Sequence, residues 1–231
     1  LPKATLAGIL LVVSFGMVDW QALAYHWRAT RFDAAIIATT AFTAVAISVE
    51  FCVMVGVLMS FMLTVPRAGR MLLTQFVISD NGHIHERLPD DDPCRRLLIY
   101  GLEGELFFGA TSAMERHFET IEAQITADTE VIVLRLKRVR NPDAVAIAEL
   151  DHFLQRMRSR NVRVLMCGVG LDLYHVMERV GLAERIGEEI FLEQRVRQTS
   201  TIRAIQHGYQ LLSERCADCP WRKIGGGRPT A

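Results

Sequence analysis

The stretch between Ala34 and Val65 is an almost unbroken run of apolar and small residues, with a single charge at Glu50. A helix that crosses the hydrocarbon layer of a bilayer, roughly 30 Å thick, needs about 20 apolar residues. The run is long enough to be embedded in a membrane and is too long for a single core element of a soluble domain. The residues that follow it have the ordinary charged composition of a soluble protein.

Charged side chains are distributed unevenly around this run. Residues 1–65 contain three basic and three acidic side chains, whereas the whole chain has 26 of each. Residues 66–231 therefore form a charge-balanced part that is long enough to bury a core of its own. A balanced surface offers no basic stripe that could displace counterions from phosphates, so we expect no nucleic-acid partner.

As one helix, the apolar run would extend about 48 Å, which exceeds the thickness of the hydrocarbon layer. We therefore expect two shorter helices, over residues 34–49 and 51–65. Glu50 then lies at the turn of a membrane hairpin, where its carboxylate reaches water or a partner. A single tilted helix with Glu50 facing a protein interior remains the alternative. Residues 4–18 form a further apolar segment, so residues 1–65 are predicted to consist of transmembrane helices.

Basic residues flank the long run on both sides, which indicates its orientation. His26, Arg28 and Arg31 precede it, and Arg67 and Arg70 follow it. Basic flanks are typical of the cytoplasmic side, and a hairpin returns to the side from which it started. We therefore expect a multi-pass protein of the cell (inner) membrane with its soluble domain in the cytoplasm. The connector at residues 19–33 has aromatic side chains that either anchor at the membrane interface or pack in a loop: Trp20, Tyr25 and Trp27.

The soluble part alternates short β-rich segments with helical patterns. Residues 66–93 are interpreted as a linker with an edge strand, and residues 213–231 as a disordered tail. Two β-rich pieces are expected around Gly101 and Gly104. The further strands are predicted at 130–137, 162–168 and 189–193, and the helices at 110–126, 144–159, 171–180 and 199–212. Strands that alternate with helices need crossover connections, so the fold class is α/β with a mixed, mostly parallel sheet.

The order of several segments resembles one known family. They are LPKATLAGILLVVSFGM, the double apolar segment that follows Asp33, LLIYGLEGELFFGA and NPDAVAIAEL. Together they resemble the C-terminal part of the sulfate permease (SulP) anion transporters, which end with their last membrane helices and a cytoplasmic STAS domain. That domain has the fold of the anti-sigma-factor antagonists. The resemblance extends from Leu1 to about Leu212.

The resemblance implies a C-terminal fragment of a secondary transporter for an inorganic anion such as sulfate or bicarbonate. It places the end of the third-last helix at residues 1–18 and the STAS domain at residues 94–212. The anion site is then built in sequence absent from this chain, so we expect no substrate-binding residue here. A homodimer is implied, with the STAS domain in regulation and dimer contacts. The alternative is a membrane-tethered signalling module that binds a partner protein through its STAS surface.

STAS proteins that act as phosphorylation switches present an Asp followed by a Ser or Thr after the second core strand. The matching stretch here contains Asn141, Asp143, Ala144 and Val145, and it offers no hydroxyl group. A phosphate switch needs a residue that can accept the phosphate, so we expect none at this loop. Asp143 is interpreted as the N-cap of the next helix. The loop remains a candidate regulatory or docking surface.

Other candidate residues give weaker patterns. Cys216 and Cys219 form a CxxC, but a structural zinc site needs four ligands and no second pair follows. His83 and His85 alternate as on a strand face, which favours an exposed hairpin edge over a metal site. No combination of nucleophile and base is evident, and the glycine-rich stretches match no phosphate-binding fingerprint. We therefore expect no catalytic residue, metal or cofactor.

A basic cluster lies at the end of the predicted strand 130–137, formed by Arg135, Lys137, Arg138 and Arg140. Such a cluster can contact anionic lipid headgroups, with each charge contributing about 1 kcal/mol. A solvated rim of charges is the simpler interpretation, and the sequence favours it.

Overall fold

The computed structural model describes residues 2–79, 83–91, 93–193 and 199–213. Cys216, Cys219 and most of the expected tail lie outside these residues. The chain divides into two compact units, Leu1–Val65 and Pro66–Ala231, which are described separately.

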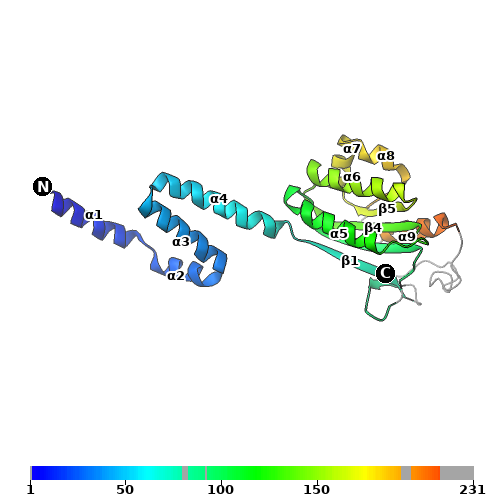
Figure 1. Cartoon of the computed structure of the whole chain (residues 1–231), viewed down its shortest axis with the longest axis horizontal. Helices are drawn as coiled ribbons and strands as arrows, with labels where there is room; N and C mark the ends of the chain where they lie inside the picture. The colour runs from blue at the N-terminus through cyan, green and yellow to red at the C-terminus, as the bar shows by residue number, and fades with distance from the viewer. Residues whose placement is uncertain (1, 80–82, 92, 194–198, 214–231) are drawn as a thin grey trace. The chain divides into compact units, whose positions relative to one another are not determined.

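The N-terminal unit is helical along almost its whole length (Figure 1). Its helices are α1 (Lys3–Met17), α2 (Trp20–Ala29), α3 (Arg31–Ala46) and α4 (Val49–Ala68), the last of which ends beyond the unit. The expected connector at residues 19–33 is therefore helical over most of its length, because Asp19 caps α2 through the N–H groups of Gln21 and Ala22. Thr30 ends α2 and caps α3 through the N–H of Asp33, so the two helices are separated by a single residue.

The long apolar run is divided into two helices, and the break lies at Ile47 and Ser48. The N–H groups of both residues bond to the carbonyl of Thr43, and the Ser48 hydroxyl then accepts the N–H of Phe51. Glu50, expected at the turn, instead lies in the first turn of α4. A carboxylate is favoured there because the N-terminus of a helix carries partial positive charge.

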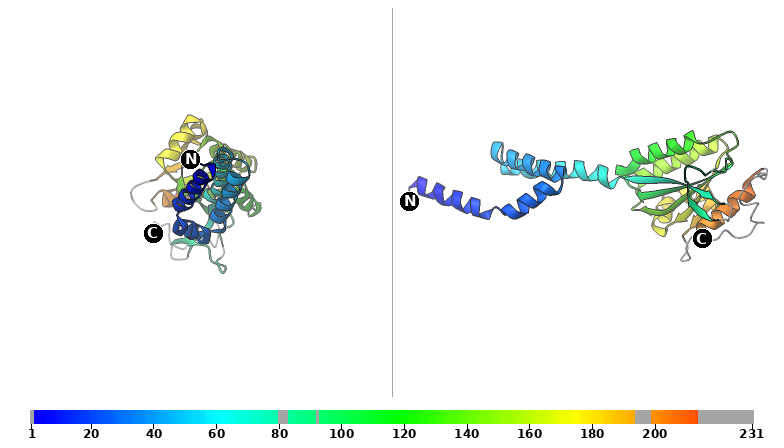
Figure 2. Two further views of the ribbon diagram at one scale, coloured as in Figure 1. Left: turned by 90° about the vertical axis from the view of Figure 1, so that its left-hand side faces the viewer. Right: turned by 90° about the horizontal axis from the view of Figure 1, so that it is seen from below.

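Helix α4 is long and apolar enough to cross a membrane, with a mean hydropathy of 2.0 over its most apolar window and no buried residue in that window. Within the described residues, α1 and α2 pass the same test only as a pair, bent by 51°. Figures 1 and 2 agree that α3 and α4 lie side by side, and a side chain at Gly56 would meet the methyl group of Thr40 at 2.8 Å. Large apolar side chains are exposed along this pair, including Phe42, Val45, Met54 and Phe61.

The C-terminal unit is built on one six-stranded sheet in the order β2-β1-β3-β4-β5-β6. The strands are β1 (Met71–Ile78), β2 (Ile84–Glu86), β3 (Leu97–Glu105), β4 (Val131–Arg140), β5 (Arg163–Val169) and β6 (Ile190–Leu192). Strands β3 to β6 are parallel, and β1 runs antiparallel to β3 and β2. The sheet is mixed and mostly parallel, as expected. The two β-rich pieces expected around Gly101 and Gly104 are one strand, β3.

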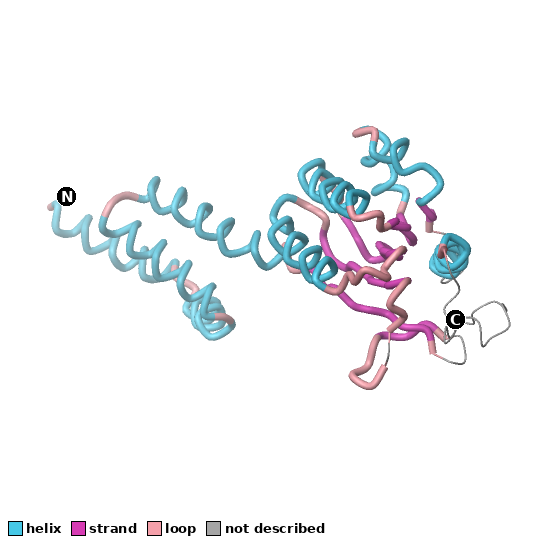
Figure 3. The backbone as a smooth tube through the Cα atoms, turned by 45° about the vertical axis from the view of Figure 1, so that its right-hand side comes forward, coloured by secondary structure: helices cyan, strands magenta, loops and turns pink. Residues whose placement is uncertain are grey.

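Helices cover both faces of the sheet (Figures 1 and 3). They are η1 (Phe108–Ala110), α5 (Thr111–Ala123), α6 (Ala144–Ser159), α7 (Leu171–Arg179), α8 (Leu182–Ile186), η2 (Gly187–Glu189) and α9 (Thr199–Leu211). Residues of α5, α6, α7 and α8 form one core with the sheet, and α9 forms a second core on the other face. The short helix α8 was not predicted, because its five residues are too few to show a helical period.

The middle strand β4 is buried on both faces because successive side chains of a strand point in opposite directions. Ile132, Leu134 and Leu136 belong to the core beneath α5 and α6, where the rings of Phe118 and Phe153 stack with centroids 4.3 Å apart. Val131 and Val133 belong to the second core, with Ala204 and Ile205 of α9.

Candidate functional site

The candidate loop connects the carboxyl end of β4 to the start of α6. In parallel sheets, the carboxyl ends of the strands form the edge at which binding sites are usually built. Asn141 turns the chain with a φ of 49°, in the left-handed region that asparagine tolerates better than most residues. Two residues later, Asp143 adopts extended backbone and α6 begins.

Asp143 holds this edge together through both of its carboxylate oxygens. One oxygen accepts the N–H of Ala146 at 2.8 Å, which is the predicted N-cap interaction. The other accepts the N–H of Phe108 at 2.7 Å, and the N–H of Asp143 donates to the carbonyl of Leu106 at 2.9 Å. The residue therefore joins the start of α6 to the segment that follows β3. The sequence pattern gave no sign of this second role.

A second pair of contacts fixes the first residue of the loop. The side-chain amide of Asn141 donates to the carboxylate of Glu105, and the N–H of Leu106 donates to the carbonyl of Arg140 at 2.8 Å. The loop is thereby fastened to the end of β3 at both of its ends.

Two large apolar side chains are exposed beside this framework. Val145 is 56% exposed and Phe108 is 49% exposed, and Ala144 is also exposed. The N–H groups of Phe108 and Ala146 share the carboxylate of Asp143, so Phe108 and Val145 lie near each other. We call Phe108, Ala144 and Val145 the apolar loop surface. Ala144 and Val145 are predicted from the sequence, whereas Phe108 is not, because its only signal is the pair of aromatic residues before a predicted helix.

The apolar loop surface is suited to contact with apolar side chains. Its exposed side chains are apolar, and the Asp143 carboxylate is engaged by backbone N–H groups. Residues 141–146 contain no hydroxyl group, so the absence of a phosphorylation switch remains our prediction. Detection of phosphate on residues 141–148 by mass spectrometry, after incubation with a cognate kinase, would contradict it.

Two of the four side chains in the basic cluster at the end of β4 are paired with carboxylates. Arg138 forms an ion pair with Glu103 at 2.9 Å, and Lys137 forms one with Glu193 at 3.5 Å. The guanidinium of Arg135 lies 5.2 Å from the centre of the Phe76 ring. These contacts favour the solvated rim over a lipid-binding patch, because half of the positive charge that would attract anionic headgroups is already compensated.

The two histidines lie at β2, at the edge of the sheet. His85 contacts the carboxylate of Asp91 at 3.0 Å, which also accepts the N–H of Leu88. The hydrogen bond from Leu88 and the neighbouring His85 hold the pKa of Asp91 below its ordinary value, although partial desolvation opposes them. Within the described ranges, no three His, Cys, Asp or Glu side chains come together as a metal site.

Comparison with known proteins agrees with this fold. Residues 89–198 match the family model described as STAS domain. The putative sulfate transporter YvdB of Bacillus subtilis is 24% identical over 193 residues, which cover 83% of this chain and 34% of the relative. The bicarbonate transporter BicA of Picosynechococcus is 22% identical over 192 residues, which cover 80% of this chain and 33% of the relative. The chain thus spans about a third of the length of these relatives.

Two solved structures share the fold at low sequence identity. The structure described as the overall structure of SLC26A9 has a TM-score of 0.63 at 14% identity, and covers 83% of this chain and 32% of its own. The murine Slc26a9 anion transporter in the inward-facing state has a TM-score of 0.61 at 13% identity, over 84% of this chain and 31% of its own. Residues 89–198 therefore match the STAS domain family, and the chain is similar over most of its length to proteins described as sulfate and bicarbonate transporters.

Proposed function

We propose that this chain is the C-terminal portion of a secondary transporter for an inorganic anion, sulfate-like or bicarbonate-like. Residues 1–65 are its last membrane helices, and the STAS domain lies in the cytoplasm, where it regulates transport and contributes to a homodimer. The transported anion binds in a membrane core outside this chain.

The extent of the sequence similarity supports this proposal most directly. The matched regions cover 80% and 83% of the chain, although the STAS model matches residues 89–198 alone. The similarity therefore extends into the helices before the STAS domain. These helices expose large apolar side chains, among them Phe42, Val45 and Phe61, which are stable in contact with lipid and costly in contact with water.

Transport is tested by uptake of labelled sulfate and bicarbonate into proteoliposomes that contain the natural polypeptide to which this chain belongs. We expect uptake of at least one of the two anions above the level of empty liposomes. A panel that also includes chloride, nitrate and oxalate separates a change in anion preference from a loss of transport. The absence of uptake across the whole panel would contradict the proposal.

A second candidate function is favoured by the apolar loop surface. Phe108 and Val145 are exposed at the edge of the sheet, where hydrogen bonds hold the loop in place. An exposed apolar surface of this kind suits a protein partner that contributes apolar side chains. In this alternative, the chain is a membrane-tethered STAS module that signals through a partner protein and transports nothing.

The docking alternative is tested with a matched pair of variants. Val145→Glu places a charge on the apolar loop surface, and Val180→Glu places the same charge on another exposed valine. If the loop surface binds a partner, a protein that copurifies with the wild-type chain is lost from V145E and retained by V180E. Retention by both variants, or loss from both, would contradict docking at this surface.

A further inference from the structure

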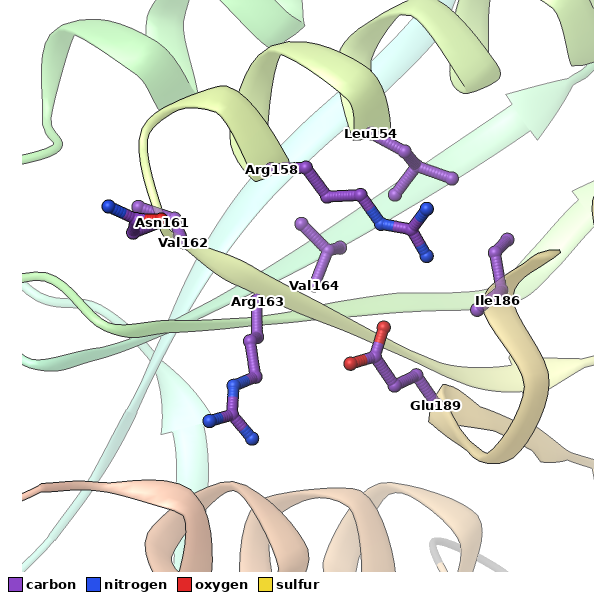
Figure 4. Close-up of a pocket in the computed structure, with 8 residues that line it drawn as sticks. All are labelled: Leu154, Arg158, Asn161, Val162, Arg163, Val164, Ile186 and Glu189. Atoms are coloured by element: carbon purple, nitrogen blue, oxygen red, sulfur yellow. The ribbon is translucent and has the colours of Figure 1, made fainter.

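A cavity of about 460 Å³ (Figure 4) lies beside the C-terminal end of α6, whereas the candidate loop precedes the N-terminal end of this helix. It forms where α6 ends and β5 begins, beside α8 and η2. Its volume is within the range of pockets that bind small organic ligands. Neither the proposed transport function nor the STAS family match assigns a role to it.

The floor of the cavity is apolar. It is formed by side chains that are more than 90% buried and come from three elements and the turn before β5: Leu154, Val162, Val164 and Ile186. A floor of this kind favours the apolar body of a ligand, because water is displaced from apolar surface when the ligand binds.

The rim of the cavity is polar and contains two guanidinium groups. Arg158 and Asn161 lie at the end of α6, Arg163 begins β5, and Glu189 ends η2. In Figure 4 the carboxylate of Glu189 lies between the two guanidinium groups, yet no ion pair within 4.0 Å joins it to either arginine. The turn at Asn161, which has a φ of 58°, brings Arg158 and Arg163 to the rim of the same cavity.

The two arginines differ in how firmly they are held. Arg158 donates to the carbonyl of Arg185 at 2.7 Å, so its side chain is oriented across the cavity toward α8. The backbone of Arg163 is fixed by its N–H, which donates to the carbonyl of Glu130 at 2.9 Å. Among the described contacts, the Arg163 guanidinium makes no hydrogen bond and no ion pair within 4.0 Å, although its charge acts on the Glu130 carboxylate. Its donors therefore remain available to a ligand.

We propose that this cavity binds a small organic carboxylate with an apolar body. The guanidinium groups are suited to a carboxylate because they donate paired hydrogen bonds to its two oxygens. The two guanidinium groups face the carboxylate of Glu189, and the charge of Arg163 also acts on the nearby carboxylate of Glu130, so the site has little excess positive charge, which favours a monoanion over a dianion such as sulfate. The apolar floor favours an organic carboxylate over a small inorganic anion.

The proposal is tested by ¹⁹F NMR titration of the full chain in detergent micelles with 4-fluorobenzoate. The neutral analogue 4-fluorobenzamide measures the contribution of the carboxylate, and inorganic sulfate is added as a competitor. We expect saturable binding of the benzoate, much weaker binding of the benzamide, and little competition by sulfate. Equal binding of the benzoate and the benzamide, or displacement of the benzoate by equimolar sulfate, would overturn the proposal.

Variants locate the binding to this cavity. Arg163→Ala removes the available guanidinium and is expected to weaken benzoate binding about tenfold, in line with the loss of a charged hydrogen bond. Glu189→Gln is expected to strengthen it, because a repulsive charge is removed. Arg179→Ala, which removes an exposed arginine from α7 outside the cavity, is the matched control and is expected to change nothing.

Unfolding temperatures confirm that each variant is folded. Equal effects of R163A and R179A, or no saturable binding by the wild-type chain, would also overturn the proposal.

Discussion

At the scale of single residues, Asp143 is the most informative position, because one carboxylate serves two parts of the fold. We predict that Asp143→Ala lowers the free energy of unfolding by about 1–3 kcal/mol, since it removes an N-cap and leaves the N–H of Phe108 without its acceptor. Asp143→Asn is expected to recover part of the loss, because asparagine also caps helices. Urea unfolding of the full chain in micelles measures the difference.

The control for this prediction is Asp128→Ala, which removes an exposed carboxylate from the turn before β4. Its effect is expected to stay within about 0.5 kcal/mol, as for most surface substitutions. Equal effects of D143A and D128A would show that Asp143 does not join the two segments.

Cysteine reactivity gives a second prediction at this scale. Burial raises the pKa of the Cys167 thiol to about 11, although the hydroxyl of Thr201 and the charge of Arg135 oppose the shift. The thiol is therefore protonated and inaccessible at neutral pH, whereas Cys94 is partly exposed. We expect maleimide at pH 7 to label Cys94 in the folded chain and Cys167 only after unfolding, as measured by mass spectrometry of peptides. Rapid labelling of Cys167 in the folded chain would contradict the buried position.

Glu130 gives a prediction for the dependence of stability on pH. Partial burial raises the pKa of Glu130, but hydrogen bonds from Ser213 and the charges of Arg96 and Arg163 outweigh this effect and lower the pKa below its ordinary value of 4.5. A carboxylate with a lowered pKa stabilises the fold above pH 4.5, and this contribution is lost as the pH falls through the lowered value.

Glu130→Gln is therefore expected to reduce stability at pH 7 and to make it less dependent on pH below 4.5. Thermal unfolding of both proteins between pH 3 and pH 7 measures this, and the two curves are expected to converge at low pH. A constant difference across the whole range would show that the ionised form of Glu130 is not the stabilising one.

At the scale of secondary structure elements, the sequence predicts an element best where its apolar residues recur at a regular spacing and a capping residue marks its end. Helix α6 begins after Asp143 and ends at Ser159, as predicted, because its apolar residues recur at helical spacing and its N-cap is a good one. Strands β4 and β5 are recognisable from their β-branched residues, although β4 continues to Arg140, three residues beyond the predicted end.

The errors at this scale come from contacts with distant parts of the chain. The glycines of β3 suggest an interruption, but Gly101 is needed because the ring of Phe76 in β1 lies 2.7 Å from where its Cβ would be. Gly104 has a φ of 137°, which favours glycine at the close approach to Arg70 and Met71. Strand β1 forms by pairing with β3, and that pairing cannot be seen in either segment alone.

In the candidate site too, the local interaction was predicted and the contact between distant residues was not. Asp143 was predicted as an N-cap because that interaction is local in the sequence. Its bond to Phe108 joins residues 35 positions apart and was not predictable from one sequence. Helix α2 was missed for a different reason, because its polar and aromatic residues were interpreted as a connector.

At the scale of the whole molecule, we propose one transporter that combines a membrane part with a cytoplasmic STAS domain. The evidence for the domain is its sheet topology and its family match, and the evidence for the membrane part is exposed apolar surface together with similarity to transporters beyond the STAS domain. The carboxylate ligand proposed for the cavity beside α6 is independent of the transported anion.

The most direct test compares anion uptake by the natural polypeptide with uptake by the same polypeptide lacking residues 71–231, which include all six strands of the sheet. Both are reconstituted at equal protein density in proteoliposomes, with labelled sulfate and bicarbonate as substrates. We predict that the intact protein transports one of these anions and that removal of the STAS domain changes the rate. Uptake that is absent from both proteins, or identical in both, would contradict it.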